Sequence, residues 1–102
     1  MTQTYPLTSC QSLKPGQMKR FIVNDKAVLL ANVNGEIYAI ADLCSHEDAI
    51  LSNGALKDGC VECPLHGSRF DLKTGLPREE PATEPVETYT VEIQGDTICV
   101  RL

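Results

Sequence analysis

Two short segments of the chain each combine a cysteine with a histidine. The first is Cys44-Ser45-His46, the second is Cys63-Pro64-Leu65-His66, and sixteen residues separate them. The chain contains only these two histidines. Thiolate sulfur and neutral imidazole nitrogen are ligands for zinc and for the iron of iron–sulfur clusters. The two segments therefore predict a metal centre with two cysteine and two histidine ligands.

The order of the ligands favours one of these two metals. Zinc sites of this composition usually pair cysteine with cysteine and histidine with histidine at short spacing, whereas each segment here is mixed. A mixed segment suits a two-iron cluster in which one iron takes both thiolates and the other takes both imidazoles. Cys44 and Cys63 would bind the inner iron, and His46 and His66 the outer iron.

A structural zinc module is the alternative, and it depends on a third cysteine. Cys60 forms a Cys-x-x-Cys pair with Cys63. However, residues 60–62 have the composition of a strand, which would turn Cys60 and Cys63 to opposite sides. We therefore interpret Cys60, together with Cys10 and Cys99, as small buried hydrophobic residues. An odd total of five cysteines does not indicate a disulfide framework.

Length and charge exclude several classes of function. A chain of 102 residues is predicted to form one domain. Its formal net charge of −5 disfavours binding to nucleic acid or to an anionic membrane. No apolar run approaches the roughly 18 residues that a membrane helix needs. The first ten residues lack the pattern of a signal peptide, so the expected compartment is the cytoplasm.

The elements that must position the four ligands are predicted to be short antiparallel strands. Residues 18–23, 27–33 and 36–41 are rich in strand-forming residues, and Asn34-Gly35 predicts a two-residue hairpin turn between the last two. Residues 89–94 alternate, and the Gly95-Asp96 turn returns the chain into residues 97–101. Helical periodicity is absent, so the fold class is all-β, a sandwich or barrel.

The segment between these hairpins has a different composition. Residues 42–77 are rich in turn formers, which predicts an inserted, loop-rich subdomain whose order depends on more than apolar burial. Thr74-Gly75 is predicted to be a turn, and Arg69 is a candidate ion-pair partner of Asp71 or Glu62. Residues 77–85 are predicted to form an extended surface connection.

Together, the two segments resemble the Rieske [2Fe–2S] family. The second continues as Cys63-Pro64-Leu65-His66-Gly67-Ser68-Arg69-Phe70-Asp71, followed by Thr74-Gly75, and the resemblance covers nearly the whole chain. It implies one [2Fe–2S] cluster and an antiparallel β-sandwich with an inserted cluster-binding subdomain. It also implies a single Rieske domain, with a base formed by residues 1–41 and 72–102 and a cluster-binding part formed by residues 42–71.

Departures from the family pattern bear on the reduction potential. The high-potential members carry a disulfide where this chain has Ala49 and Leu65, and a tyrosine where it has Phe70. Phe70 cannot donate a hydrogen bond to a ligand sulfur, whereas Ser68 matches a family serine that can donate to a bridging sulfide. Few hydrogen-bond donors to the cluster sulfurs and a negative net charge both oppose the addition of an electron. We therefore expect a reduction potential near the low end of the roughly −150 to +300 mV range of Rieske clusters.

The resemblance implies a function in electron transfer and not in catalysis. A terminal oxygenase needs an additional two-histidine, one-carboxylate iron site, for which no third histidine is present. The expected role is a soluble, monomeric ferredoxin that passes single electrons from a flavin-dependent NAD(P)H reductase to an oxygenase, such as an aromatic-ring-hydroxylating dioxygenase. The alternatives are a Rieske-type ferredoxin of iron–sulfur assembly and the small subunit of a nitrite reductase.

Residues beside the ligands are candidates for docking or for supporting the cluster. Glu47 and Asp48 adjoin His46 and are either docking charges or solvated turn residues. Pro64 and Leu65 are either loop packing or an apolar contact patch. The supporting candidates in the second segment are Gly67, Ser68 and Phe70.

Overall fold

Antiparallel strands account for most of the computed structural model, which describes residues 3–45, 49–65, 67–79 and 84–102. No α-helix occurs within these ranges, and none of their elements is long and apolar enough to cross a membrane as a helix. Two 3₁₀ turns are present, η1 and η2. The elements are β1 (Thr4–Ser9), η1 (Cys10–Ser12), β2 (Met18–Val23), β3 (Lys26–Val33), β4 (Glu36–Ala41), η2 (Leu51–Asn53), β5 (Ala55–Lys57), β6 (Cys60–Glu62), β7 (Arg69–Asp71), β8 (Pro77–Glu79), β9 (Thr88–Gln94) and β10 (Thr97–Arg101).

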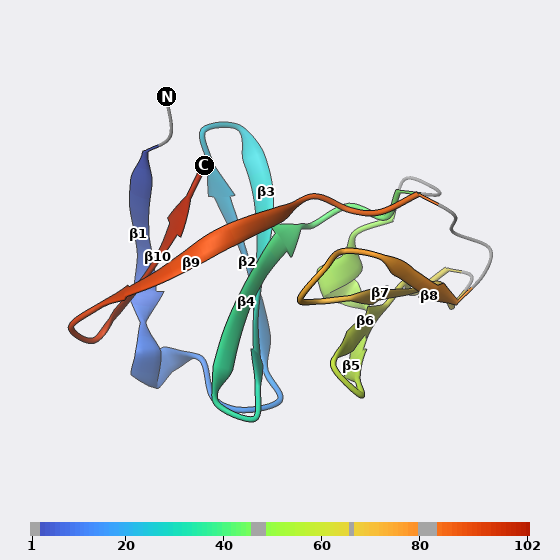
Figure 1. Ribbon diagram of the computed structural model, residues 1–102, viewed down its shortest axis with the longest axis horizontal. Coiled ribbons are helices and arrows are strands. Elements are labelled where there is room, and N and C mark those ends of the chain that lie inside the picture. Colours follow the sequence, from blue (N-terminus) through green and yellow to red (C-terminus); the bar gives the residue numbers. More distant parts are fainter. Residues whose placement is uncertain (1–2, 46–48, 66, 80–83) are drawn as a thin grey trace.

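The larger sheet has six strands in the order β1-β10-β9-β4-β3-β2, with every neighbouring pair antiparallel (Figure 1). The strands predicted at 18–23, 27–33 and 36–41 and the C-terminal hairpin are confirmed. In the β3–β4 turn, Asn34 and Gly35 have φ angles of 54° and 95°, which is the geometry that this dipeptide favours. The all-β prediction is therefore confirmed.

A smaller sheet of four strands, in the order β5-β6-β7-β8, lies between β4 and β9 in the sequence. The prediction of a loop-rich insertion was incomplete, because this region forms its own sheet. Each of its strands has three residues, too few to produce a recognisable alternation. The predicted surface connection also begins in a strand, because Pro77 and Glu79 of β8 pair with β7.

Strand β3 of the large sheet has side chains buried on both of its faces. Val28 and Leu30 belong to one buried cluster, which the large sheet forms with Leu13, Ile98 and Val100. Leu29 and Ala31 point the other way, into a second cluster that the small sheet completes. Its members, all less than 9% exposed, are Leu29, Ala31, Ile40, Cys44, Ala49, Leu51, Val61, Cys63, Phe70, Leu72 and Val86. This second cluster joins the two layers.

The arrangement in space separates the chain ends from the small sheet. In Figure 1, strands β1 and β10 lie on the far side of the large sheet from β5–β8. The small sheet is therefore presented at one end of the molecule, next to β4. The predicted division into a base of residues 1–41 and 72–102 and a cluster-binding part of residues 42–71 remains a prediction.

Candidate metal centre

Two of the four predicted ligands, Cys44 and Cys63, are buried in the cluster that joins the sheets. They are 3% and 2% exposed, and neither forms a disulfide. Cys44 lies three residues after the end of β4, and Cys63 directly follows β6. His46 and His66 fall outside the described residues, as do Glu47 and Asp48. The structure thus brings the predicted thiols into one apolar environment.

Both cysteines begin loops that close in the same way. The amide of Cys44 donates a hydrogen bond to the carbonyl oxygen of Ala49 at 2.9 Å, and that of Cys63 donates to the carbonyl of Ser68 at 2.7 Å. In each case the acceptor lies five residues further along the chain. In the second loop, the amide of Gly67 also donates to the carbonyl of Cys63 at 3.2 Å. Each loop therefore holds its cysteine at a fixed, hydrogen-bonded base.

The first loop is also tied to the segment that leads into β9. The Ser45 hydroxyl donates a hydrogen bond to the backbone carbonyl of Glu84, thirty-nine residues away in sequence. Ser45 itself is exposed. This contact holds the residue that precedes His46 against a distant part of the chain.

The other candidates in the second segment divide into exposed and buried groups. Pro64 is exposed, and Leu65 is 60% exposed, which is unusual for a large apolar side chain. Ser68 and Phe70 are completely buried. Gly67 is half-buried and has a φ angle of +75°, a conformation that non-glycine residues adopt with strain. The segment thus combines a buried base with an apolar exposed tip.

The polar neighbours of β7 are satisfied by ion pairs and a turn. Arg69 pairs with Glu62 at 3.0 Å, one of the two predicted partners, whereas Asp71 pairs with Arg78 at 2.9 Å. Asp71 also accepts hydrogen bonds from the amides of Lys73 and Thr74, which confirms the predicted turn. These contacts brace the strand that leads away from the second loop.

Cys60 is separated from the two predicted ligands. It is 8% exposed but does not belong to the buried cluster that contains Cys44 and Cys63. Burial raises the pKa of the Cys60 thiol, and the Asp71 carboxylate opposite it raises the pKa further, while Arg78 and Arg69 oppose the shift. Cys60 therefore lies outside the apolar environment that Cys44 and Cys63 share, which disfavours the zinc alternative.

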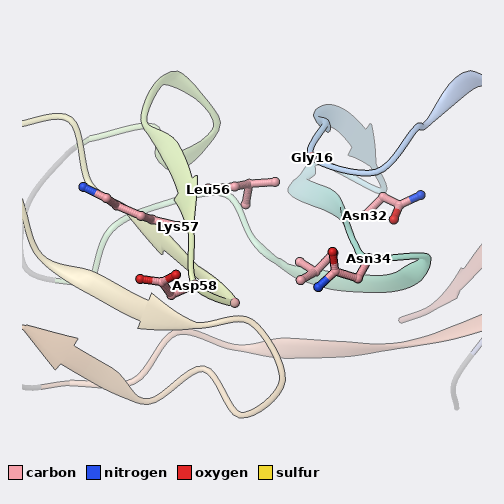
Figure 2. Close-up of a pocket in the computed structure, with 8 residues that line it drawn as sticks. Gly16, Asn32, Asn34, Leu56, Lys57 and Asp58 are labelled. Carbon is pink, nitrogen blue, oxygen red and sulfur yellow. The ribbon is translucent and has the colours of Figure 1, made fainter.

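Two open clefts in the described part of the chain are lined by residues other than Cys44 and Cys63. One, of about 230 Å³, separates the β3–β4 turn from the β5–β6 hairpin, with Asn32 and Asn34 on one side and Leu56 and Asp58 on the other (Figure 2). The other, of about 420 Å³, adjoins the first loop and is lined in part by Leu43 and Ile50.

The donor set fits the predicted two-iron cluster as far as the described residues extend. Neither cysteine forms a disulfide, both lie in the same buried cluster, and both start loops that contain a histidine in the sequence. The described ranges contain no group of three or more metal-binding side chains, because both histidines fall outside them. Cys44 and Cys63 supply the two thiolates that the thiolate-bound iron of such a cluster needs.

Comparison with known proteins identifies close relatives over nearly the whole chain. The sequence model of the Rieske [2Fe-2S] domain matches residues 3–90. The ferredoxin component of biphenyl 2,3-dioxygenase from Rhodococcus jostii strain RHA1 is 42% identical over 96 residues, which cover 94% of this chain and 90% of that protein. The anthranilate 1,2-dioxygenase ferredoxin subunit of Burkholderia cepacia is 37% identical over 102 residues, which cover 100% of this chain and 94% of the relative.

Solved structures agree with these sequence relatives. The ferredoxin of carbazole 1,9a-dioxygenase from Nocardioides aromaticivorans IC177 has a TM-score of 0.89 and 37% identity, with 94% of this chain and 96% of that chain covered. A complex of reduced oxygenase and oxidized ferredoxin in carbazole 1,9a-dioxygenase contains a chain with a TM-score of 0.90 and 31% identity, covering 95% of this chain and 91% of that one. A nitrite reductase small subunit has a TM-score of 0.83 but only 24% identity, with 96% and 97% coverage, so it shows a shared fold alone.

Proposed function

The chain belongs to the Rieske [2Fe–2S] family, and we propose that it is the ferredoxin of a multi-component oxygenase system. It takes single electrons from a flavin-dependent NAD(P)H reductase and passes them to a terminal oxygenase of the ring-hydroxylating class. The observation that carries this proposal is the near full-length match, at 42% identity, to a dioxygenase ferredoxin component. The chain is thus an electron-transfer component and does not itself catalyse the oxygenation.

The proposed ligands are the four residues of the two loops. Cys44 and Cys63 would hold one iron, and His46 and His66 the other. When bound, a [2Fe–2S] cluster supplies one reversible electron. The burial of both cysteines in an apolar core excludes water from their side of the site. Amide groups at the base of each loop are already paired with carbonyls of the same loop, which fixes the direction of both cysteines.

The exposed tip of the second loop is the proposed contact for both partners. Pro64 and Leu65 are exposed and precede His66 directly, so they would meet a docked protein beside an imidazole ligand. A partner surface there would bury an apolar side chain that is otherwise 60% exposed. Glu47 adds a docking charge in the first loop. Gly67, Ser68 and Phe70 support the second loop from within.

The net charge and the relatives define the kind of partner. A chain with a net charge of −5 favours a basic docking face on the reductase and the oxygenase, which would speed their encounter at low salt. A ferredoxin bound to its oxygenase has been solved in the carbazole 1,9a-dioxygenase system. We propose a cytoplasmic, monomeric carrier that binds neither nucleic acid nor membranes. The nitrite reductase alternative is not favoured, because the resemblance to such subunits, at 24% identity, extends only to the fold.

Spectroscopy and reconstitution together test this function. An EPR spectrum of the dithionite-reduced chain, with iron, zinc and sulfide analysis, should give a rhombic signal of low average g and equal amounts of iron and sulfide. Purified reductases and oxygenases of the biphenyl and anthranilate systems should then turn over when the chain replaces their own ferredoxin. A colourless, zinc-loaded chain would overturn the cofactor, and a loaded chain that supports no oxygenase of a broad panel would overturn the role.

A further inference from the structure

A buried carboxylate lies at the entrance to the first loop. Asp42 follows β4 directly, two residues before Cys44, and is 1% exposed. Ionised carboxylates are almost never buried to this degree without compensating partners, because removal from water is costly. The residue was not among the candidates that the sequence suggested, since its burial depends on partners elsewhere in the chain.

Three hydrogen bonds from two partners compensate the charge of Asp42. The amide of Ser52 donates to Oδ1 at 2.7 Å, and the Ser52 hydroxyl donates to Oδ2 at 2.6 Å. Arg20 on β2 donates from Nη1 to Oδ2 at 3.0 Å, forming an ion pair whose arginine side chain is 36% exposed and whose aspartate side chain is fully buried. Charged hydrogen bonds of this length are among the strongest in proteins.

These contacts close the first loop at its base. Asp42 and Ser52 are ten residues apart and bracket Cys44, whose own amide is tied to Ala49 inside the same bracket. Ser52 belongs to η2, which lies against both β2 and β6. Arg20 adds a link from β2 to this base. The first loop is therefore joined at one point to the large sheet and to the strand that leads into Cys63.

We propose that Asp42 is a positioning residue for the cluster, which fixes the first ligand loop to the large sheet through Ser52 and Arg20. The inference rests on the proposed function, because it takes Cys44 as a cluster ligand. Without the carboxylate, the first loop loses the hydrogen bond from the Ser52 hydroxyl and the ion pair with Arg20. Cys44 then no longer has a fixed position relative to Cys63. Residues that orient metal ligands from outside typically change metal retention roughly 10-fold or more when replaced.

The ion pair also gives this role an electrostatic signature. Reduction adds a negative charge to the cluster, so a nearby fixed anion opposes it and a nearby fixed cation favours it. Asp42→Asn should therefore raise the reduction potential, whereas Arg20→Gln should lower it. A role limited to general stability would not produce opposite shifts, because both substitutions break the same ion pair.

The experiment compares loaded variants with a matched control. The variants are Asp42→Asn, Arg20→Gln, Ser52→Ala and Ser52→Thr, and each is measured for potential, EPR spectrum, unfolding and cluster loss to an iron chelator. The control is Asn32→Ala, which removes another buried polar side chain, 6% exposed, that bonds to Leu13 and Gly35 away from both loops. Ser52→Thr keeps the hydroxyl and should restore the behaviour of the wild type.

We expect Asp42→Asn and Ser52→Ala to lose the cluster roughly 10-fold faster than Asn32→Ala at matched unfolding stability. Equal rates in these variants and the control, or potentials that shift in the same direction for Asp42→Asn and Arg20→Gln, would overturn the positioning role. If Asp42→Asn does not fold, the comparison of Ser52→Ala with Ser52→Thr decides the question. A wild-type chain without a Rieske signal would instead overturn the proposed function, and this inference with it.

Discussion

The amide nitrogen of Cys63 donates to the carbonyl oxygen of Ser68 at 2.7 Å, and this hydrogen bond closes the second ligand loop within six residues. Within this loop, the residue before Ser68 has a left-handed backbone conformation. Gly67 adopts it with a φ of +75°, and its own amide bonds back to Cys63 at 3.2 Å. The position of the Cys63 thiol therefore depends on a residue without a side chain.

The first prediction concerns Gly67→Ala. No atom lies within 4 Å of the position that a Cβ would take, so the cost arises from the left-handed backbone and not from a clash. We expect a loss of about 1–2 kcal/mol in the free energy of unfolding, measured with urea, and faster cluster loss. Gly16→Ala is a matched control, since Gly16 has a φ of +86°, equal space and no part in either loop. Equal cluster retention in the two variants would contradict this explanation.

Gly54 is a glycine of a different kind, and its replacement should be more damaging. A Cβ at this position would lie 1.8 Å from the carbonyl oxygen of Glu62, which is backbone of β6 and cannot rotate away. Gly54→Ala should therefore separate η2 from β6 and cost about 3 kcal/mol, seen as a lower urea midpoint. Gly59→Ala, where a Cβ meets nothing within 4 Å and only the left-handed backbone (φ +78°) adds a cost of about 1–2 kcal/mol, should cost less; a loss in Gly54→Ala no larger than this would show that η2 adapts.

The hairpins of the large sheet could be predicted because short-range chemistry determines them. Asn34-Gly35 and Gly95-Asp96 lie between runs of strand-forming residues, and the structure places two-residue turns at both. The small sheet could not be predicted in the same way. Strands of three residues, such as Ala55–Lys57, carry no periodic signal, and their pairing depends on contacts with β6 and β7.

Of the candidate site, the sequence suggests only the proposed ligands, and their role remains a prediction. The types and spacing of Cys44 and Cys63 are visible in the sequence, and their burial is consistent with the prediction that they bind iron. The role of Asp42 depends on Arg20, 22 residues away, and on Ser52, ten residues away, and neither spacing forms a recognisable motif. Long-range partners of this kind become apparent only when the chain is folded.

Cys60 offers a direct test of the ligand set. Its burial raises the pKa of its thiol, and it lies outside the cluster that contains the predicted ligands. Cys60→Ala should therefore keep the Rieske EPR signal and cost about 1 kcal/mol of stability, whereas Cys44→Ser and Cys63→Ser should abolish the signal. Cys99→Ala, at a residue 2% exposed in the large sheet, is the control for removal of a buried thiol. Loss of the signal in Cys60→Ala would contradict the proposed ligand set, because it would show that the cluster needs Cys60.

Asp71 should make the stability of the small sheet depend on pH. Burial alone would raise the pKa of Asp71, but hydrogen bonds from Arg78 and from the amides of Thr74 and Lys73 outweigh it, so the pKa is lowered. A carboxyl with a lowered pKa contributes stability above its unfolded pKa of about 3.9, and the contribution disappears as the pH falls through the folded value. We expect about 1 kcal/mol at neutral pH, since Arg78 is 63% exposed and solvent screens the pair.

Unfolding rates after pH jumps measure this contribution before acid removes the cluster. Asp71→Asn should unfold faster than the wild type at about pH 6, and the two rates should converge towards about pH 3. Arg78→Gln should reproduce part of the effect, and the double variant should add little to Asp71→Asn. A rate difference that persists unchanged at low pH would contradict the assignment to the ionised carboxylate.

The last prediction is that the chain has a low Rieske potential, which a single hydroxyl can raise. Phe70 is completely buried in the cluster that contains Cys44 and Cys63, and it cannot donate a hydrogen bond. In Phe70→Tyr, a phenol that donates to a ligand sulfur would favour the reduced state by about 1–2 kcal/mol. For one electron this corresponds to a rise of roughly 40–90 mV in a redox titration.

Phe21→Tyr is the matched control, because Phe21 packs against the buried cluster of the large sheet, which contains neither Cys44 nor Cys63. This replacement should leave the reduction potential unchanged. If the hydroxyl at position 70 finds no acceptor, it becomes a buried unsatisfied donor that lowers the free energy of unfolding by about 1–3 kcal/mol. Stability loss without a change in potential would therefore show that residue 70 does not reach a ligand sulfur. A wild-type reduction midpoint well above 0 mV would contradict the predicted low potential. Phe70 donates no hydrogen bond that would favour the reduced cluster, and a net charge of −5 opposes the addition of an electron.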